Sequence, residues 1–455
     1  MGHAYAMVLA DVIARYHGWI GEEVYFLTGT DEHGLKNLQS AQKAGMDPQQ
    51  FLDIQADKFK DLAARLGANP SVFYRTTDKE RHWPGATKMW EALASKGDIY
   101  KGTYEGLYCI GCESFKTEKE LVDGKCPDHN TVPEKISQEN YFFKLSAYAA
   151  KIKEAIESGA MKVVPEARKN EILSFIGEGL EDVSFSRPAK DLPWGIPVPG
   201  DPTHNMYVWC DALTNYISAL GYGNENTELL KKFWPGMHVI GKDILRFHAA
   251  FWPGMLLSAG LPLPKEILVH GLILSDGKKM SKTMGNVVDP LAYIDEFGTD
   301  AFRFYLIKEI NPFADGDFTR EKFVESYNAY LANGIGNLTS RVMKMATTYL
   351  ENPVPYPARV VEVTDFKKLM NVHEINKAAD VLWARITGLD LLIQEKQPFK
   401  MIKIDPEEAK RIVTHLVEEL WVIADHLKPL LPETAKKIEA SLRGHTMPEP
   451  LFLRK

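Results

Sequence analysis

The N-terminal and central parts of the chain alternate short apolar segments with longer segments of helical periodicity. The clearest apolar segments are 24–27, 238–240 and 267–269, which contain mainly β-branched, aromatic or leucine residues. Short strands that alternate with helices are typical of a parallel sheet covered by helices. We therefore predict an α/β domain in which these three segments are strands.

Each predicted strand is followed by residues that can do chemistry. These are Thr-Gly-Thr-Asp-Glu-His-Gly at 28–34, Gly-Lys-Asp at 241–243 and His-Gly at 270–271. Ligands of open α/β sheets bind at the carboxyl ends of the strands. We expect the three segments to surround one site, although any one of them alone is equally compatible with an ordinary polar turn.

Two other regions depart from this alternation. Residues 100–206 carry a cysteine cluster and a proline-rich stretch, and we interpret them as an insertion into the α/β domain. From Arg320 onwards, and again over 406–427, apolar residues recur at helical spacing. The proline-containing segment 352–357 cannot continue a helix. The C-terminal part is therefore predicted to be a helical bundle.

Bulk composition adds little to this picture. A chain of 455 residues with 45% hydrophobic content can form more than one core, and at roughly 150 residues per domain we expect about three domains. The net charge of −7 argues against a generally basic nucleic-acid binder, although a local basic surface remains compatible with it. The apolar run 6–14 is interrupted by Asp11 and follows no basic segment, so neither a signal peptide nor a membrane span is predicted.

Cys109, Cys112, Cys126 and His129 have the spacing of a zinc site. Two residues separate the members of each pair, and thirteen residues lie between Cys112 and Cys126. Three thiolates and one imidazole complete a tetrahedral shell with no open position, which favours a structural zinc ion. The alternative is three unrelated buried thiols, and the fourth cysteine, Cys210, is assigned no role. Clustered cysteines of this kind also suggest a reducing, cytoplasmic setting.

The segment 276–286 places the side chains of Lys278, Lys279 and Lys282 between glycines. Flexible ammonium groups suit transient binding of a triphosphate, because a lysine charge can follow a moving pyrophosphate. A solvated basic turn is the simple alternative. The string Lys-Met-Ser-Lys-Thr at 279–283, however, resembles the second signature of class I aminoacyl-tRNA synthetases, which usually ends in Ser.

The start of the chain resembles part of the first signature of that class, His-x-Gly-His. Gly2 and His3 match its last two positions, and its first His has no counterpart in the printed sequence. In that class the signature opens a helix whose N–H groups and imidazoles meet the ATP phosphates. The resemblance implies that His3, Lys279 and Lys282 are catalytic. It also implies that Gly2 and Lys282 bind ATP together with Mg²⁺.

The segment 206–216 resembles the part of methionyl-tRNA synthetases that lines the amino-acid pocket. The resemblance implies that Asp31 holds the α-amino group of methionine. It implies that the pocket residues are Trp209, Ala212, Leu213, Tyr216, Ile244 and His248. A polarizable thioether is well matched to aromatic edges. Without the neighbouring motifs, an aromatic stripe in a protein core would be the default interpretation.

Further ATP contacts are implied at the ends of the two later predicted strands. Asp243, which follows Gly241, matches the ribose contact of the family, and Val269 and His270 would bring main-chain groups to the adenine. A carboxylate that accepts a ribose hydroxyl is common in nucleotide sites.

Asn337 and Arg341 match family residues that contact the methionine anticodon. They are four residues apart and hence on one helix face, although such a pair is also common on ordinary surfaces. Phe399 stands where the family usually has the Trp that stacks on an anticodon base. A phenyl ring still stacks, but it offers less area and no indole donor.

The resemblance covers essentially the whole chain and implies its fold and reaction. The implied fold is a Rossmann-like parallel-sheet catalytic domain with a zinc-bearing insertion, followed by an all-α anticodon-binding bundle. The implied boundaries are 1–99 and 207–272 for the halves of the catalytic domain, 100–206 for the insertion, 273–325 for a stem-contact region and 326–455 for the bundle. The implied enzyme is a monomeric methionine–tRNA ligase that uses ATP, L-methionine and tRNA(Met), contains one structural Zn²⁺ and contacts no membrane.

Two alternatives stay open. Another class I enzyme is one of them, but a cysteine enzyme would need zinc in its active site and a leucine enzyme is usually much longer. The second is a catalytically impaired homologue that still binds tRNA through its bundle, motivated by the missing first His and the strand expected before it. A start of the natural chain upstream of Met1 is our preferred explanation for that gap.

Overall fold

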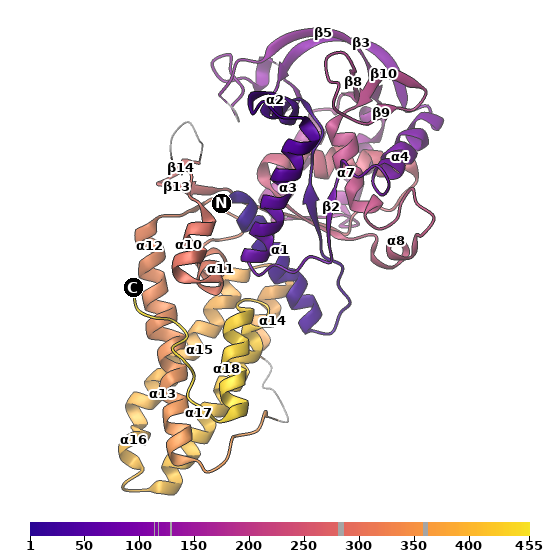
Figure 1. Ribbon diagram of the computed structural model, residues 1–455. Helices are drawn as coiled ribbons and strands as arrows, with labels where there is room; N and C mark the ends of the chain where they lie inside the picture. Colours follow the sequence, from indigo (N-terminus) through magenta and orange to yellow (C-terminus); the bar gives the residue numbers. More distant parts are fainter. Residues whose placement is uncertain (113, 117, 128–129, 281–285, 358–362) are drawn as a thin grey trace. The chain divides into compact units, whose positions relative to one another are not determined.

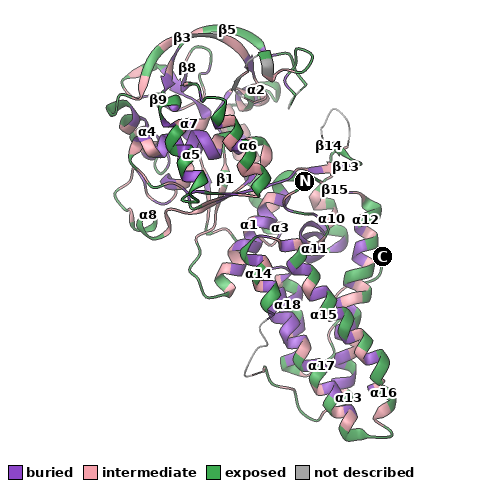
Figure 2. Cartoon of the chain, turned by 180° about the vertical axis from the view of Figure 1, so that it is seen from behind, coloured by how far each residue is buried: buried purple, intermediate pink, exposed green. Residues whose placement is uncertain are grey.

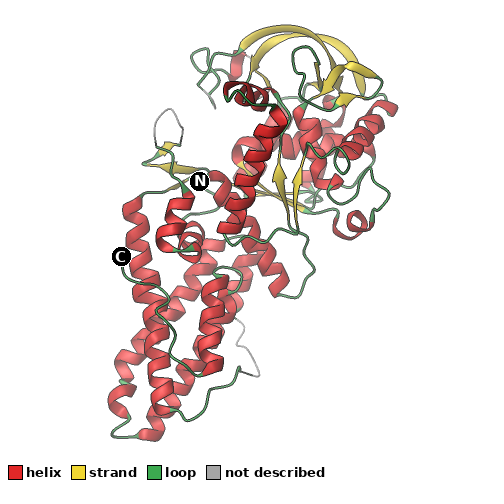
Figure 3. Ribbon diagram, in the orientation of Figure 1, coloured by secondary structure: helices red, strands yellow, loops and turns green. Residues whose placement is uncertain are grey.

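The computed structural model of the chain describes residues 1–112, 114–116, 118–127, 130–280, 286–357 and 363–455. The chain divides into two compact units (Figure 1). Unit 1 contains Met1–Val24, Leu62–Asn69 and His270–Lys455, and unit 2 contains Tyr25–Asp61 and Pro70–Val269. Unit 1 is mostly helical, whereas unit 2 mixes helices and strands (Figure 3). The predicted combination of an α/β region and an all-α region is confirmed.

Unit 2 holds most of the strands. They are β1 (Leu27–Thr30), β2 (Val72–Arg75), β3 (Ile99–Cys109), β4 (Ser114–Lys116), β5 (Glu134–Phe143), β6 (Lys162–Val164), β7 (Val183–Ser184), β8 (Ser186–Pro188), β9 (Pro197–Val198), β10 (Asp201–Met206), β11 (Met237–Gly241) and β12 (Glu266–His270). The α-helices are α2 (Leu35–Lys43), α3 (Pro48–Arg65), α4 (Trp83–Ser95), α5 (Ala149–Glu157), α6 (Glu166–Gly177), α7 (Val208–Ser218), α8 (Glu228–Phe233) and α9 (Trp252–Ala259). Short 3₁₀ or π turns form η1 (Glu118–Glu120), η2 (Leu145–Tyr148), η3 (Lys242–Ile244) and η4 (Phe247–Phe251). Both α3 and β12 end in unit 1.

Parallel strand pairs form the base of unit 2. β1 pairs with β2 from Leu27 opposite Val72 onwards, and β12 pairs with β6 in a sheet of order β11-β12-β6. The predicted strands at 238–240 and 267–269 are therefore confirmed as β11 and β12. The helices α4, α7 and α9 bury large apolar side chains in one core, among them Trp90 and Trp252.

The first predicted strand begins later than expected, at Leu27 rather than at residue 24. In a parallel ladder every second N–H of a strand faces the same partner. The Ser71 N–H donates to the Phe26 carbonyl at 2.7 Å, but the next N–H in register, that of Asn69, donates to the Asp11 carboxylate at 3.1 Å instead. The prediction was wrong for 24–26 because hydrophobicity alone does not show whether the partner segment has N–H groups free to pair.

The segment between α4 and α7 forms two antiparallel sheets. β3 and β5 pair over their whole length, from Ile99 opposite Phe143 to Tyr108 opposite Glu134, in a sheet of order β4-β3-β5-β7. The second sheet has the order β8-β10-β9. Pairing of β3 with β5 brings Cys109, at the end of β3, and Cys112, just after it, close to Cys126, which precedes β5.

Unit 1 contains the helical bundle and one small sheet. The helices are α1 (Gly2–Trp19), α10 (Pro290–Phe297), α11 (Thr299–Lys308), α12 (Arg320–Ser326), the π-helical η6 (Tyr327–Gly336), α13 (Asn337–Tyr349), α14 (Thr364–Asn371), α15 (Ile375–Lys396), α16 (Pro398–Met401), α17 (Pro406–Leu427) and α18 (Pro432–Gly444). The strands β13 (Ile273–Ser275), β14 (Lys278–Lys279) and β15 (Gly316–Asp317) form a sheet of order β14-β13-β15.

The helical predictions for this unit are confirmed. A helix begins at Arg320, α17 spans the predicted 406–427, and the segment 352–357 lies in no helix. The bundle helices carry both buried and exposed residues (Figure 2). α17 buries one side of its first turns and is buried all round from Leu420 to Leu427. Within the described part of the chain, every helix is too short or too polar to cross a membrane.

A buried ion pair fixes α1 within unit 1. The Arg303 guanidinium of α11 is fully buried and lies 2.7 Å from the Asp11 carboxylate of α1. It also donates to the carbonyl oxygens of Leu66 and Leu430, both at 3.1 Å. A buried charge is tolerated only when it is paired and its N–H groups are bonded. The pair therefore holds α1, which carries Gly2 and His3, against the helices of this unit.

Candidate functional site

One face of α7 gathers four of the predicted methionine-site residues. Trp209, Ala212, Leu213 and Tyr216 stand at positions i, i+3, i+4 and i+7, which share one side of a helix. Ala212 and Leu213 are buried, and the two aromatic rings pack against the core of unit 2. The structure thus brings these four side chains to one apolar face.

Aromatic rings from β11 and from η4 complete this face. Trp209 stacks on Phe247 with ring centroids 3.9 Å apart and planes 6° from parallel. His248 meets the edges of both Trp209 and Tyr216. His238 lies 3.8 Å from Tyr216, measured between ring centroids. We call the rings of Trp209, Tyr216, His238, Phe247 and His248 the aromatic cluster.

His248 is neutral in this environment. Its Nδ1–H donates to the Ile244 carbonyl at 3.0 Å, so its Nε2 accepts the hydroxyl proton of Tyr216 at 2.8 Å. Burial lowers the pKa of His248 to about 4, and burial also raises the pKa of Tyr216. The wall that Tyr216, Ile244 and His248 form therefore carries no charge near neutral pH.

A π-helical turn explains how Phe247 and His248 reach this position. η4 is followed directly by α9, which has Pro253 at its start. Pro253 has no N–H to donate to the carbonyl four residues before it, which disfavours a regular α-helical turn at that point. The wider turn is thus encoded locally by the sequence Trp-Pro.

Asp31 lies in the loop that follows β1, and its neighbours anchor that loop. The Asn215 side chain of α7 donates to the Asp31 carboxylate at 3.4 Å. Glu32 is buried, and its carboxylate accepts from the Arg75 guanidinium of β2 at 2.7 Å. Its backbone N–H donates to the Thr76 hydroxyl oxygen at 2.8 Å. Asp31 is therefore held between β2 and α7, next to the aromatic cluster.

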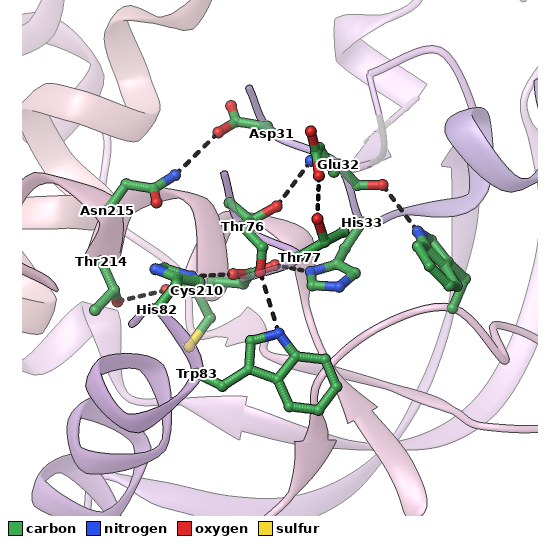
Figure 4. A network of polar contacts seen from close by, with 12 residues as sticks. Asp31, Glu32, His33, Thr76, Thr77, His82, Trp83, Cys210, Thr214 and Asn215 are labelled. Atoms are coloured by element: carbon green, nitrogen blue, oxygen red, sulfur yellow. Dashed lines mark hydrogen bonds and ion pairs between the residues drawn. The ribbon is translucent and has the colours of Figure 1, made fainter. Parts of the chain in front are cut away.

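Sequence reasoning assigned no role to three buried side chains beside Asp31. Asp211 of α7 forms hydrogen bonds with both His33 and His82, two of the residues labelled in Figure 4. A carboxylate at position 211 inside the apolar run Val-Trp-Cys-Asp-Ala-Leu is itself a signal, because a charge in a buried helix needs partners. The identity of those partners requires the fold.

The predicted ATP-binding residues of unit 2 follow its strands as expected. Gly241 is the last residue of β11 and Asp243 lies exposed in η3. Val269 is buried in β12. Asp243 and Val269 thus stand at or near the carboxyl ends of neighbouring strands, as predicted.

The remaining predicted ATP residues belong to unit 1. Gly2 and His3 form the first turn of α1, whose N-terminal N–H groups favour anions. His270 is buried, with its ring 5.2 Å from that of Tyr5 on α1. The structure therefore brings the end of β12 next to the helix that carries His3.

The basic segment begins as a β-hairpin. β13 and β14 are joined by Asp276 and Gly277, which both have positive φ and form the two-residue turn that Asp-Gly favours. Lys279 lies exposed at the end of β14. Lys282 falls at 281–285, outside the described residues.

Three thiols form a candidate metal centre. The Sγ atoms of Cys109, Cys112 and Cys126 all lie within 4.8 Å of one another, and those of Cys112 and Cys126 are 3.5 Å apart. Zinc–sulfur bonds of about 2.3 Å in a tetrahedron place sulfur atoms about 3.8 Å apart. The three thiols can therefore share a zinc ion. The predicted fourth ligand, His129, lies outside the described residues, and Cys210 is buried in the core of unit 2.

Two of the three predicted anticodon residues, Arg341 and Phe399, line a hollow in the bundle. Asn337 and Arg341 belong to α13, one turn apart, and the Arg341 guanidinium is 2.7 Å from the Asp390 carboxylate of α15. Burial raises the pKa of Asp390, although the nearby guanidinium opposes that shift. A hollow of ≈ 380 Å³, here called the α13 hollow, is lined by Ser340, Arg341, Lys344, Met345, Ile393, Phe399 and Met447. It combines a cation with a half-exposed aromatic ring.

Two family models match most of the chain. The model described as "tRNA synthetases class I (M)" matches residues 1–132 and 128–343. The model described as "Anticodon binding domain of methionyl tRNA ligase" matches residues 358–450. Together with the fold, these matches place the chain among the class I aminoacyl-tRNA synthetases, so it is an aminoacyl-tRNA ligase.

Individual relatives narrow the class. The methionine–tRNA ligase of Clostridium perfringens is 43% identical over 97% of this chain and 70% of its own length. That of Brucella suis is 38% identical over 96% of this chain and 88% of its own length. The Mycobacterium tuberculosis methionyl-tRNA synthetase bound by methionyl-adenylate is similar with a TM-score of 0.90 and 33% identity, covering 100% of this chain and 95% of that one. The chain belongs to the methionyl-tRNA synthetase family. The predicted family is confirmed, and the leucyl and cysteinyl alternatives are set aside.

Proposed function

We propose that the chain activates L-methionine with ATP to methionyl-adenylate and transfers the methionyl group to tRNA(Met). The observation that carries this proposal is the pairing of one carboxylate, Asp31, with an uncharged aromatic wall on α7. Asn215 links that carboxylate to the helix that bears Trp209 and Tyr216. An amino acid with a cationic end and an apolar side chain matches both features.

The chemistry of the wall favours a thioether. Sulfur that lies against ring edges is stabilised by about 0.3–1.5 kcal/mol. Because His248 is neutral and its Nε2 is occupied by the Tyr216 hydroxyl, the wall offers the side chain no free charge. Ala212, Leu213 and Ile244 would fill the remaining surface. A charged or strongly polar side chain would lose its hydration there without gaining a partner.

The activation step needs alignment and charge stabilisation more than acid–base catalysis. The carboxylate of methionine is already ionised at neutral pH and can attack the α-phosphorus of ATP directly. We assign His3, Lys279 and Lys282 to the phosphate charge, with Gly2 allowing the phosphates close to the N-terminus of α1. Mg²⁺, when bound with ATP, would neutralise part of the same charge.

We assign binding of the nucleoside part of ATP to residues at the carboxyl ends of β11 and β12. We propose that the Asp243 carboxylate accepts a ribose hydroxyl, next to Gly241. Main-chain groups of Val269 and His270 would face the adenine. The support for these roles is the position of Asp243 just after β11 and of Val269 within β12.

The helical bundle is assigned to tRNA(Met). We propose that Asn337 and Arg341 contact the anticodon and that Phe399 stacks on one of its bases. The α13 hollow supports this role, because a guanidinium and an aromatic ring at one place suit a nucleobase. We further propose that the enzyme acts as a monomer and that Cys109, Cys112, Cys126 and His129 hold one structural Zn²⁺.

An amino-acid panel in the ATP–pyrophosphate exchange reaction tests the proposal. Methionine should stimulate exchange, and leucine, isoleucine and cysteine should not. Lys279→Ala should lower the exchange rate by about 100-fold while leaving the affinity for methionine within about twofold, because a phosphate contact acts mainly in the transition state. Lys322→Ala, which removes an exposed lysine paired with Asp317, is the matched control and should keep the wild-type rate. Exchange that depends on another amino acid and not on methionine would contradict the proposal.

A further inference from the structure

The face of α7 opposite the aromatic cluster carries a buried hydrogen-bond network. Successive helical residues are about 100° apart, so Asp211 and Ser218 point away from Trp209 and Tyr216. The two oxygens of Asp211 each lie 2.5 Å from an imidazole nitrogen, Nδ1 of His33 and Nε2 of His82. Nδ1 of His82 lies 2.8 Å from the Ser218 hydroxyl. We call His33, Asp211, His82 and Ser218 the α7 bracket.

The protons of the α7 bracket follow from its geometry. Burial tends to raise the pKa of Asp211, but His33 and His82 outweigh it and leave that pKa below the ordinary value of a carboxyl group. Asp211 is therefore an ionised acceptor, and both imidazoles donate to it. His82 with its proton on Nε2 accepts the Ser218 hydroxyl proton at Nδ1. Charge-assisted hydrogen bonds of this kind are among the strongest in a protein interior.

The α7 bracket joins three segments that are distant in the sequence. His33 is 178 residues from Asp211, and His82 is 129 residues from it. His33 closes the loop that carries Asp31, and His82 immediately precedes α4. The ring of His33 also lies beside those of Trp83 and Trp194, at 6.0 and 5.7 Å. The imidazole therefore has little freedom to move.

The same loop is also held from its other side. Glu32 is bound by Arg75 on β2, and the Trp194 indole N–H donates to the Glu32 carbonyl at 2.9 Å. Asp31 lies between the end of β1 and Glu32, which Arg75 and Trp194 hold in place. The distance between the Asp31 carboxylate and the aromatic wall of α7 is thus fixed by contacts on both sides of the loop.

We propose that His33, Asp211 and His82 are positioning residues that set the length of side chain the enzyme accepts. The inference rests on the proposed function, in which Asp31 holds the ammonium group and α7 holds the thioether. With both ends fixed, a side chain one methylene shorter or longer loses either its wall contact or its ammonium contact. A release of the α7 bracket lets the two ends move apart and weakens that discrimination.

Asp211→Asn tests the inference, because it keeps the shape of the side chain and removes its charge. Binding of L-methionine is measured by equilibrium dialysis. Exchange is measured with L-methionine, with S-methyl-L-cysteine, which is one methylene shorter, and with L-ethionine, which is one methylene longer. We expect the dissociation constant for methionine to rise about tenfold and the preference for methionine over the two homologues to fall about tenfold. The KM for ATP should change by less than about twofold.

Thr214→Val is the matched control. Thr214 lies on α7 and is fully buried, and its hydroxyl donates to the Cys210 carbonyl of its own helix at 2.7 Å, not to a member of the α7 bracket. This variant should keep the wild-type affinity and selectivity. Equal losses of selectivity in the Asp211 and Thr214 variants would mean that any disturbance of α7 has this effect, and would overturn the inference. Unchanged selectivity in Asp211→Asn would overturn it too.

Two further measurements keep the test decisive. If Asp211→Asn does not fold, as judged by circular dichroism, Ser218→Ala removes the outer end of the α7 bracket and should lower selectivity by about threefold. No change in that variant overturns the inference. If the wild-type chain shows no methionine-dependent exchange, the proposed function fails, whereas normal wild-type exchange with unchanged selectivity in both variants defeats only the inference.

Discussion

The proposed methionine residues of unit 2 and the proposed anticodon residues of unit 1 are held in opposite ways. Leu213 and His248 are 1% and 3% exposed. Asp211, on the same helix as Leu213, forms a hydrogen bond with His82, which is 129 residues away in the sequence. Phe399 is 42% exposed, and Arg341 is anchored through one carboxylate, Asp390. A rigid site can select a small ligand by its size, whereas a large and flexible ligand can adapt to an open surface. Mutations should therefore affect the two regions independently.

Asp31→Asn should give the largest effect on the methionine side. Loss of a charge-assisted contact with the ammonium group should raise the dissociation constant for methionine by about 10- to 100-fold. Affinity for tRNA should stay at the wild-type value. Equilibrium dialysis and filter binding measure the two constants.

Asp53→Asn is the control for this prediction. Asp53 is a carboxylate of the same unit that pairs with Arg75 at 2.7 Å and has no proposed contact with methionine. It should leave methionine binding within about twofold of wild type. If both variants lost methionine affinity equally, the special role of Asp31 would be refuted.

Arg341→Gln should give the largest effect on the tRNA side. Removal of the guanidinium should lower kcat/KM for tRNA by about tenfold, while methionine-dependent exchange stays unchanged. Lys410→Gln removes a half-exposed lysine of α17 that pairs with Glu407, and should behave as wild type. A fall in exchange by Arg341→Gln would show that the two regions are not independent.

These two regions also differ in how far the sequence could predict them. The spacing of Trp209, Ala212, Leu213 and Tyr216 shows that they share a helix face, and Asn337 with Arg341 is a local pair of the same kind. Contacts within one helix depend only on its periodicity.

Contacts between distant segments were not predictable. The partners of Asp211 lie in two loops that only the fold brings together, and Asp390 reaches Arg341 from another helix. The later start of β1 has the same origin, because the Asp11 carboxylate takes the N–H that a longer ladder would need. The sequence showed which side chains carry the proposed chemistry, but not which distant residues hold those side chains in place.

His248 should make the free energy of unfolding depend on pH, which is a moderate effect that concerns the methionine side alone. Its pKa is about 4 in the folded chain against 6.5 for a free histidine, so between these values only the unfolded chain binds the proton. The free energy of unfolding should therefore fall as the pH falls from 6.5 towards 4, by up to about 1.4 kcal/mol per pH unit from this residue.

His248→Asn should remove that part of the pH dependence. His238, whose pKa is lowered by burial and, to a smaller extent, by His248, remains in both proteins together with Asp243, so the difference reports His248 and its effect on His238. Urea unfolding followed by tryptophan fluorescence at pH 7 and pH 5 measures the slopes. The same slope in both proteins would contradict a buried neutral His248.

Phe399→Trp should give the smallest effect, on the tRNA side alone. A larger ring that also carries an indole donor should strengthen stacking and raise tRNA affinity by about threefold. Phe399→Leu, which keeps an apolar side chain but cannot stack, should weaken binding. Equal affinities in the three proteins would show that no base stacks at this position.

A crystal structure of the chain with bound L-methionine tests the central claim most directly. We expect the ammonium nitrogen within about 3 Å of the Asp31 carboxylate and the thioether against the rings of Trp209 and Tyr216. Methionine bound in the reverse orientation, or at a place away from α7, would contradict the account.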